Sequence, residues 1–389
     1  MLAPEPFFEP RGTPFSEYHR LRALTELGHH VDFVTYPFGT DVAMPNLRII
    51  RSAKPPFVQR VRVGPSAAKV VLDAYLTVTI LRQIRREKYD AIHSHEEMGF
   101  LGVWLAKRLG IPHLYDMHSS LPQQLTNFSF ARSAVLRKAF EAMEHRTIFG
   151  SDVVITICQD LYDRVHAMGA GDRAILIENV MGGDVEDPPQ VTASAVRSRW
   201  GIPAEAPVVL YTGTFEPYQG LDMLLEAMAI VARGRRDARL LVVGGREEQV
   251  AQAKAKAAAV DAPAIFTGYQ PARDIPAYVD ASDILASPRI KGTNTPLKIY
   301  SYLRARKPIV ATDLLTHTQV LDDSIAVLAQ PEPGAFAAAI ERLLADPLLR
   351  ERIAGAAAER ARTRYSRESY VSRTHTALSR LLAAAPSRA

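Results

Sequence analysis

The sequence predicts a two-domain α/β protein in which each domain carries a doubly wound parallel sheet with helices on both faces. Short apolar runs rich in valine and isoleucine recur along the chain, are bounded by turn residues and alternate with helical patterns. A length of 389 residues exceeds what one ordinary core accommodates. The stretch 182–196, with two adjacent prolines among small polar residues, is typical of an interdomain linker. We therefore place the first domain at residues 1–185 and the second at 186–365.

The first half contains six apolar runs that predict strands. They lie at residues 30–36, 47–50, 91–95, 113–118, 153–158 and 174–179. Helical patterns separate them at residues 15–27, 69–87, 100–109, 134–149 and 159–168. Before these runs, only residues 1–4 precede a proline-rich loop where a first strand would normally be complete. Either this opening strand is short, or the start of the chain lies further upstream.

The second half repeats the alternation. Its predicted strands lie at residues 208–214, 240–245, 264–269, 284–288, 308–312 and 325–329. Its predicted helices lie at residues 221–233, 247–260, 275–281, 298–304 and 335–345. The alanine- and arginine-rich tail at 348–385 predicts two or more helices with a break near Tyr365 and Ser366.

Composition is that of a globular protein, with 47% hydrophobic and 23% charged residues. No apolar run approaches the ~18 residues of a membrane span, and residues 1–14 lack the pattern of a signal peptide, so we expect a cytoplasmic protein. A net charge of +5, from 47 basic and 42 acidic residues, is no nucleic-acid signature. The single cysteine, Cys158, excludes an internal disulfide and a cysteine-based metal cluster.

Positive charge concentrates at residues 54–88, where eight basic residues stand against two acidic ones and alternate with apolar side chains. Such a surface suits anionic lipid head groups. A solvated helix face with a neighbouring loop explains the same residues. Peripheral attachment to the inner face of a membrane therefore stays open beside a freely cytoplasmic protein.

Two predicted strand-to-helix loops suit an anionic ligand, because parallel sheets bind ligands at the carboxyl ends of their strands. In the first, Gly12 permits a close backbone approach, and Thr13 suits both a helix cap near Phe15 and a phosphate contact. In the second, Gly213 and Thr214 end a strand just before a helix, so a diphosphate fits there. An ordinary capped turn is an equal alternative in both places.

A third loop combines a helix start with positive charge. The residues that open the predicted helix are Asn294, Thr295, Pro296, Leu297 and Lys298. Because proline suits the first helical turn, the following backbone amides should point outward at the end of the sheet. Three positive charges lie within ten residues, at Arg289, Lys291 and Lys298. This density favours a diphosphate site over a merely solvated basic loop.

Three histidines end two neighbouring predicted strands of the first half: His93, His95 and His118. A zinc site is not the leading hypothesis, because His93 and His95 alternate along one strand and the acidic neighbours, Asp116 among them, form no defined ligand set. We expect His118 to contact substrate and His93 to pack or bond to backbone. No serine elbow, Walker loop or dinucleotide fingerprint is present, which disfavours a hydrolase, kinase or dehydrogenase.

Taken in order, several segments resemble glycosyltransferase family 4 of the GT-B fold over essentially the whole chain. Among them are YDAIHSHEEMGFLG, IPHLYDMHSS, VVLYTGTFEPYQGLDMLLEA and TPLKIYSYLRARKPIVAT. The resemblance implies two Rossmann-like domains facing a cleft, with the nucleotide sugar on the C-terminal domain and the acceptor mainly on the N-terminal one. It also implies that a final segment, residues 366–389, returns to the N-terminal domain as a helix near 367–382.

By position, the resemblance assigns roles to individual residues. Gly12 and Thr13 match the acceptor-side loop near the donor phosphates, and His118 matches the histidine beside the transferred sugar. The segment that holds the nucleobase is matched by Tyr269 and Gln270, and the loop that binds phosphate and sugar hydroxyls is matched by residues 294–298. Two glutamates common in the family are replaced by Thr293 and Ser301, and its arginine and lysine pair by Thr214 and Gln219.

The resemblance implies a retaining glycosyltransferase of hexosyl type that moves a sugar from a nucleoside diphosphate sugar to a hydroxyl of a glycan or lipid-linked glycan. In it Arg289, Lys291 and Lys298 would stabilise the leaving diphosphate, and Ser301 would bond a ribose hydroxyl. We expect no cofactor beyond this co-substrate and no obligatory metal. Two alternatives stay open: a catalytically weak GT-B module that binds a nucleotide or glycan, and a nucleotide-sugar epimerase.

Overall fold

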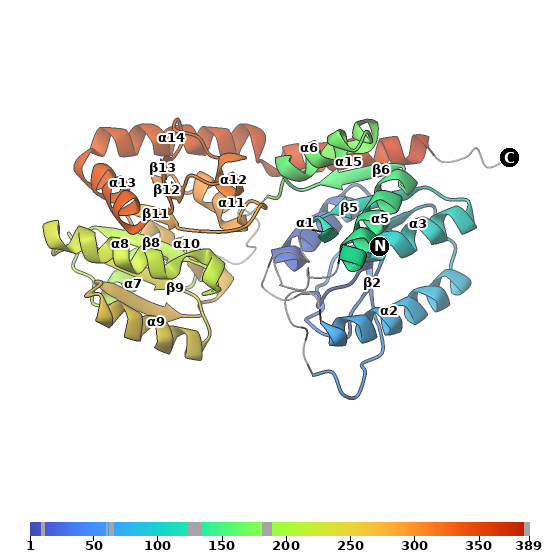
Figure 1. Cartoon of the computed structure of the whole chain (residues 1–389), viewed down its shortest axis with the longest axis horizontal. Helices are drawn as coiled ribbons and strands as arrows, with labels where there is room; N and C mark the ends of the chain where they lie inside the picture. Colours follow the sequence, from blue (N-terminus) through green and yellow to red (C-terminus); the bar gives the residue numbers. More distant parts are fainter. Residues whose placement is uncertain (9–11, 60, 62–65, 123–133, 181–188, 385–389) are drawn as a thin grey trace. The chain divides into compact units, whose positions relative to one another are not determined.

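The computed structural model describes residues 1–8, 12–59, 61, 66–122, 134–180 and 189–384. It divides into two compact units. Unit 1 combines Met1–Asn179 with Arg367–Ala389, and unit 2 is Val180–Ser366. In Figure 1 the colours follow the chain, so unit 1 holds both its blue and its red end. The expected boundary at residues 185 and 186 lies outside the described residues.

Unit 1 is built on a seven-stranded parallel sheet in the order β3-β2-β1-β4-β5-β6-β7. Its strands are β1 (Leu2–Ala3), β2 (Val31–Thr35), β3 (Leu47–Arg51), β4 (Ile92–His95), β5 (His113–Met117), β6 (Val153–Thr156) and β7 (Ala174–Leu176). Its helices are α1 (Gly12–Glu26), α2 (Ala67–Arg86), α3 (Met98–Leu109), α5 (Ala134–Gly150), α6 (Gln159–Ala167), the short η1 (Gly171–Arg173) and α15 (Arg367–Ala383). The winding direction reverses between β1 and β4, which makes their carboxyl ends the switch point of this sheet.

Unit 2 is built on a six-stranded parallel sheet in the order β10-β9-β8-β11-β12-β13. Its strands are β8 (Val208–Thr212), β9 (Arg239–Val243), β10 (Ala264–Gly268), β11 (Ile284–Ser287), β12 (Ile309–Thr312) and β13 (Val327–Ala329). Its helices are α7 (Ala193–Arg199), η2 (Pro217–Gln219), α8 (Leu221–Gly234), α9 (Glu247–Ala259), η3 (Ala272–Asp274), α10 (Ile275–Asp280), α11 (Leu297–Arg304), α12 (Leu315–Thr318), α13 (Pro333–Ala345) and α14 (Pro347–Arg364). The switch point lies between β8 and β11.

Burial of both sheet faces explains why the strands are continuous apolar runs. Along β8, Val209 and Tyr211 belong to one hydrophobic core, whereas Val208 and Leu210 belong to a core on the opposite face. Successive strand side chains point to opposite faces, so a strand covered on both sides needs apolar residues at every position.

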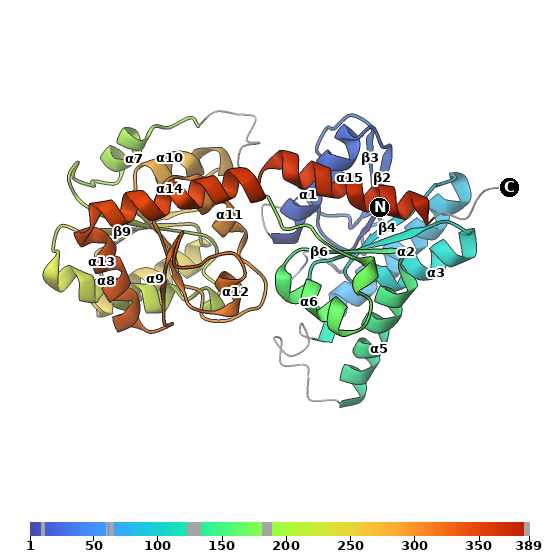
Figure 2. The same ribbon diagram turned by 90° about the horizontal axis from the view of Figure 1, so that it is seen from above.

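The last helix, α15, belongs to unit 1. It follows α14 after a break at Tyr365 and Ser366, and Tyr365 is the C-cap residue of α14. It contacts α1 and β6, and the red α15 beside α1 is visible in Figure 2. Its buried residues Tyr370, Thr374 and Ala377 recur at helical spacing toward that contact. Among the described residues, no helix is long and apolar enough to cross a membrane.

Candidate functional site

The switch point of unit 2 is formed by two loops that hold each other in place. Gly220 ends the loop after β8 at a φ of 73°, and a Cβ atom there would lie 1.9 Å from the carbonyl oxygen of Pro288. In return, the backbone N–H of Ile290, in the loop after β11, donates to the carbonyl of Tyr218 at 3.0 Å. The carboxyl ends of β8 and β11 are therefore joined backbone to backbone, as close approach at a glycine permits.

Glycines also bring the loops after β9 and β10 close to this point. The N–H of Gly244 donates to the carbonyl of Gly268 at 2.9 Å. Gly244 has a φ of 118°, and a Cβ atom there would lie 2.1 Å from the carbonyl oxygen of Gly213. The chain after β8 and after β9 and the end of β10 thus approach one another closely at glycines, and a Cβ atom on Gly244 would clash with this arrangement.

Lys298, in the first turn of α11, is directed at this backbone. Its Nζ lies 4.0 Å from the ring centroid of Tyr211, and a Cβ atom on Gly213 would be 3.3 Å from it. The ammonium is buried and has no hydrogen-bond partner within the described part of the chain. Burial, and secondarily the charge of Arg289, lowers the pKa of Lys298 to about 7. An anion bound here would supply the missing partner.

Arg289, which follows β11, braces the same loop. Its Nη1 donates to the carbonyl of Asn294 at 2.8 Å and to Oγ1 of Thr316 at 3.0 Å, and its guanidinium lies 5.1 Å from the ring centroid of Tyr218. Burial lowers the pKa of Arg289, but a guanidinium stays charged in a protein. Its Nε is buried without a hydrogen-bond partner among the residues that the structure describes.

Four buried polar atoms in this region have no hydrogen-bond partner in the described ranges of the chain. They are Nζ of Lys298, Nε of Arg289, Oγ1 of Thr295 and Oε1 of Gln219. Buried polar groups nearly always have partners, because an unmet group costs about 1–3 kcal/mol. Four of them in the loops after β8 and β11 and the first turn of α11 indicate a site for a ligand that carries both negative charge and hydrogen-bonding groups.

The other predicted residues of unit 2 are exposed or bonded to nearby backbone. Lys291 is exposed, whereas Nζ of Lys298 and Nε of Arg289 are buried, and the expected contact of Lys291 with the diphosphate stays a prediction. Thr214 is exposed, and its carbonyl accepts from the hydroxyl of Tyr211 at 2.6 Å. The nucleobase candidates at the end of β10 are Tyr269, which is 67% exposed, and Gln270, whose Nε2 donates to the carbonyl of Thr267 at 3.0 Å.

The start of α11 differs by one residue from the prediction. Pro296 precedes the helix as its N-cap residue and does not stand in its first turn, which leaves Leu297 as the first helical residue. Ser301 is half-buried one turn after Lys298, on the same side of the helix. The carbonyl of Thr293 accepts from Nε2 of Gln319 at 2.5 Å, which ties the loop to the end of α12.

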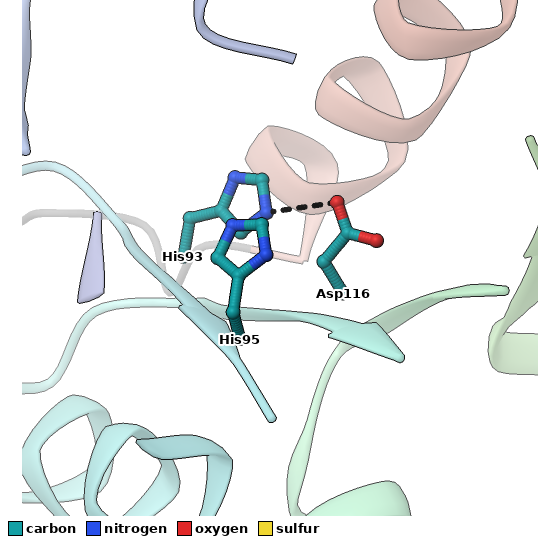
Figure 3. A group of neighbouring side chains, drawn as sticks. All are labelled: His93, His95 and Asp116. Carbon is teal, nitrogen blue, oxygen red and sulfur yellow. Dashed lines mark ion pairs between the residues drawn. The ribbon is translucent and has the colours of Figure 1, made fainter. Parts of the chain in front are cut away.

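In unit 1, the predicted histidines form one buried group at the ends of β4 and β5. Nδ1 of His95 lies 3.0 Å from Nε2 of His118, and the rings of His93 and His95 stack with centroids 4.8 Å apart. Figure 3 shows His93 and His95 on β4 facing Asp116, whose carboxylate lies 3.4 Å from Nε2 of His93. His93 therefore packs, as expected, but its polar neighbour is a carboxylate.

The position of Asp116 differs from the expectation that the acidic residues near these histidines form no ligand set. Strand pairing sets Asp116 opposite His95, and one ligand atom from each of His93, His95 and Asp116 lies within 4.8 Å of the others. A three-ligand set exists, although the sequence pattern shows none. However, Nε of Arg20 lies 2.9 Å from the same carboxylate. A guanidinium therefore already balances the charge that would attract a metal ion.

The first helix of unit 1 begins earlier than the sequence predicts. α1 starts at Gly12, so Thr13 lies inside the first turn and is not a cap for a helix that begins near Phe15. Pro14 is tolerated there because the first-turn N–H groups have no intrahelical partner. Residues 9–11 of the predicted loop are outside the described ranges. The same helix supplies Arg20 and the fully buried Glu17, two residues of the histidine group that no motif indicates.

Two doubly wound parallel-sheet units, each with its switch point at the carboxyl ends of its strands, define a protein of the GT-B class. Solved structures agree with this class. Sucrose-phosphate synthase from Thermosynechococcus elongatus has a TM-score of 0.78 at 20% identity, covering 96% of this chain and 94% of its own. Anabaena Alr3699/HepE, solved in complex with UDP and glucose, has a TM-score of 0.73 at 16% identity, covering 97% and 98%.

The chain belongs to the GT-B glycosyltransferases of the family 4 type. A family profile described as "Glycosyl transferases group 1" matches residues 193–360, and one described as "Glycosyl transferase 4-like domain" matches residues 18–179. A phosphatidyl-myo-inositol mannosyltransferase of Mycobacterium leprae is 26% identical over 367 residues, which cover 93% of this chain and 91% of that protein. The protein is therefore a glycosyltransferase enzyme.

Proposed function

We propose that this glycosyltransferase binds a nucleoside diphosphate sugar at the switch point of unit 2 and transfers the sugar, with retained configuration, to an acceptor hydroxyl. The observation that carries the proposal is the ammonium of Lys298, which is buried beside Arg289 and has no hydrogen-bond partner among the residues that the structure describes. A diphosphate supplies the anionic oxygens that both groups lack. The structural neighbour Alr3699/HepE was also solved with UDP-glucose, which supports a donor of this class.

The chemistry assigned to these residues is stabilisation of the leaving group. Negative charge grows on the diphosphate as the glycosidic bond breaks, and two preorganised cations in a site with little water oppose that charge strongly. The departing phosphate would then accept the acceptor's proton on the same face, which retains configuration and needs no separate carboxylate base. In this scheme His118 lies beside the transferred sugar and no metal is required.

A donor screen tests the function. Purified protein is incubated with nucleoside diphosphate sugars, with and without glycan acceptors, and products are measured by mass spectrometry and sugar analysis. We expect one donor to yield a glycosylated acceptor with the donor's anomeric configuration. Calorimetric binding of a nucleoside diphosphate with no turnover of any donor would instead favour a binding module. Conversion of a donor sugar without acceptor and without mass change would favour an epimerase.

For the acceptor we propose a glycan or a lipid-linked glycan reached at an anionic membrane surface. On α2, the apolar side chains of Val70, Tyr75 and Val78 are exposed. The basic side chains of Arg82 and Arg85, further along the same helix, are exposed as well, so an apolar surface is followed by a basic one. The mannosyltransferase relative is named for a phosphatidyl-myo-inositol. Flotation with vesicles rich in anionic lipid should recover the protein, and neutral vesicles should not. Equal recovery with both would remove the anionic surface from the proposal, and no recovery with either would remove the membrane.

Nucleotide binding should weaken as the pH rises from 7 to 9. The pKa of Lys298 is about 7 in the free protein, and a bound diphosphate favours the charged ammonium and raises that pKa. Below pH 7 the lysine is already charged, whereas above it each binding event takes up a proton and affinity falls by up to about tenfold per pH unit. Calorimetry with UDP in two buffers of different ionisation enthalpy measures both the affinity and the proton uptake.

The range from pH 7 to 9 avoids the ionisation of the terminal phosphate, whose pKa is near 6. Lys298→Met serves as the reference protein, since it removes the titrating group. An affinity that is constant across this range in the wild-type protein, with no proton uptake, would contradict the placement of the diphosphate at Lys298.

A further inference from the structure

The C-terminal helix α15 reaches the histidine group of unit 1 through one buried arginine. Nη1 of Arg20 donates to Oγ1 of Thr374 at 2.7 Å, and its guanidinium lies 4.8 Å from the ring centroid of Tyr370. The hydroxyl of Thr374 in turn donates to the backbone carbonyl of Tyr370 at 2.9 Å. Arg20 is 2% exposed, so these two residues of α15 fix the guanidinium from one side.

On its other side, the same guanidinium holds Asp116. Nε of Arg20 donates to Oδ2 of Asp116 at 2.9 Å, and the carboxylate is almost fully buried. Burial alone would raise the pKa of Asp116, but the charge of Arg20, followed by the interactions with the neighbouring histidines, keeps the pKa well below its usual range. Asp116 is therefore an anion at neutral pH. Its Oδ1 lies 3.4 Å from Nε2 of His118.

This anion decides which nitrogen of His118 carries the proton. Burial lowers the pKa of His118, so the ring is neutral at pH 7 and has one N–H. If Nε2 held a lone pair, that lone pair would face the carboxylate at 3.4 Å and be repelled. A proton on Nε2 is attracted instead, and Nδ1 of His95 at 3.0 Å accepts it as a hydrogen bond.

Glu17, a buried neighbour of His95, is compatible with this assignment. Oε1 of Glu17 lies 3.8 Å from Nδ1 of His95, and burial followed by the charge of Glu5 raises the pKa of Glu17 well above its usual range. Glu17 is then a neutral acid and does not compete with Asp116 for the proton on His118. With Nε2 protonated, the other ring nitrogen of His118 is a hydrogen-bond acceptor.

We propose that α15 positions the active-site histidine: Thr374 and Tyr370 hold Arg20, Arg20 holds Asp116, and Asp116 keeps His118 as the Nε2–H tautomer, whose Nδ1 accepts a hydrogen bond from a sugar hydroxyl. Thr374, Tyr370, Arg20 and Asp116 are positioning residues that act through His118. The catalytic consequence rests on the proposed function, whereas the tautomer is a property of the free protein.

The test combines the tautomer with turnover. The full-length protein is labelled with 15N-histidine, His118→Gln identifies the signals of that ring, and two-bond 1H–15N spectra show which nitrogen is protonated. We expect Nε2–H in the wild type and a mixture of tautomers in Asp116→Asn, because an amide also offers a donor. With the donor found by the screen, kcat should fall about 10- to 100-fold in Asp116→Asn with a smaller change in KM.

Thr374→Val tests the contribution of α15 and has a matched control. Both Thr374 and Thr376 bond a backbone carbonyl one turn earlier, but the hydroxyl of Thr376 is exposed and remote from Arg20. Thr374→Val should add a second tautomer signal and lower kcat by roughly 3- to 10-fold. Thr374→Ser keeps the hydroxyl, so its tautomer signal and kcat should match the wild type. Thr376→Val should change neither the tautomer nor kcat.

Retention of pure Nε2–H in Asp116→Asn would overturn the assignment, and identical behaviour of Thr374→Val and Thr376→Val would overturn the role of α15. Full turnover in His118→Gln has a different meaning. It would remove His118 from the proposed reaction while the spectra still decide the tautomer.

Discussion

Replacement of Lys298 by methionine should lower kcat/KM for the nucleotide-sugar donor by about 100- to 1000-fold, the usual loss when one preorganised donor to a developing anion is removed. Methionine keeps the length and apolar character of the side chain, so Tyr211 stays covered. It also removes a buried charge that has no partner in the described structure. The loss should therefore occur without loss of thermal stability, which separates a chemical role from a structural one.

Lys254 supplies the matched control, because it is an exposed lysine on α9 of the same unit. Lys254→Met should leave kcat/KM within about twofold, as expected for an exposed surface substitution. Arg289→Ala forms the second arm and should also reduce turnover, with some loss of stability because the hydrogen bonds from Arg289 to the carbonyl of Asn294 and to Oγ1 of Thr316 are lost. Wild-type turnover in both Lys298→Met and Arg289→Ala would contradict a diphosphate at this site.

Gly220→Ala should destabilise unit 2 by about 2–4 kcal/mol, because it combines a strained backbone with a steric clash. The φ of 73° disfavours any residue with a Cβ atom, and that atom would lie 1.9 Å from the carbonyl oxygen of Pro288. Relief requires the loops after β8 and β11 to separate, which displaces Tyr218 from the N–H of Ile290. Thermal unfolding followed by circular dichroism measures the loss.

The control is Gly234→Ala at the end of α8, the same helix that Gly220 precedes. A Cβ atom on Gly234 meets nothing within 4 Å, so alanine should be neutral or stabilise the helix by up to about 1 kcal/mol. Equal melting temperatures for the two variants would show that the loops accommodate a side chain, and the locked switch point would then be wrong. The affinity for UDP should likewise be lower in Gly220→Ala than in Gly234→Ala.

Much of the fold was predictable, because strands buried on both faces leave continuous apolar runs. The predicted strand at 208–214 contains β8, the one at 240–245 overlaps β9 but misses its first residue, Arg239, and the short opening strand is β1, with two residues. Local signals were weaker at helix starts. Thr13 was predicted as a cap but lies inside α1, and Pro296 was predicted inside a helix but is the N-cap residue of α11. Both errors have one cause, because a residue that suits a cap position also suits the adjoining first turn.

The candidate site was predictable only in part. Arg289 and Lys298 were found because they flank a helix start, but the exposure of Lys291 depends on how the loop turns at Gly292, where φ is 121°. Arg20 and Thr374, which reach His118 through Asp116, left no sequence signal. Arg20 is 96 residues from Asp116 and 354 from Thr374, and contacts between such distant side chains produce no periodicity.

The division of unit 1 between the two ends of the chain has a consequence for its synthesis. Residues 1–179 leave the ribosome first, but α15 follows only after all of unit 2 has been made. At typical rates of translation the roughly 190 intervening residues take on the order of 10–40 s. During this interval Arg20 has neither Thr374 nor Tyr370 to contact. A nascent chain halted before residue 367 should therefore expose the α1 face that α15 later covers, where a chaperone can bind.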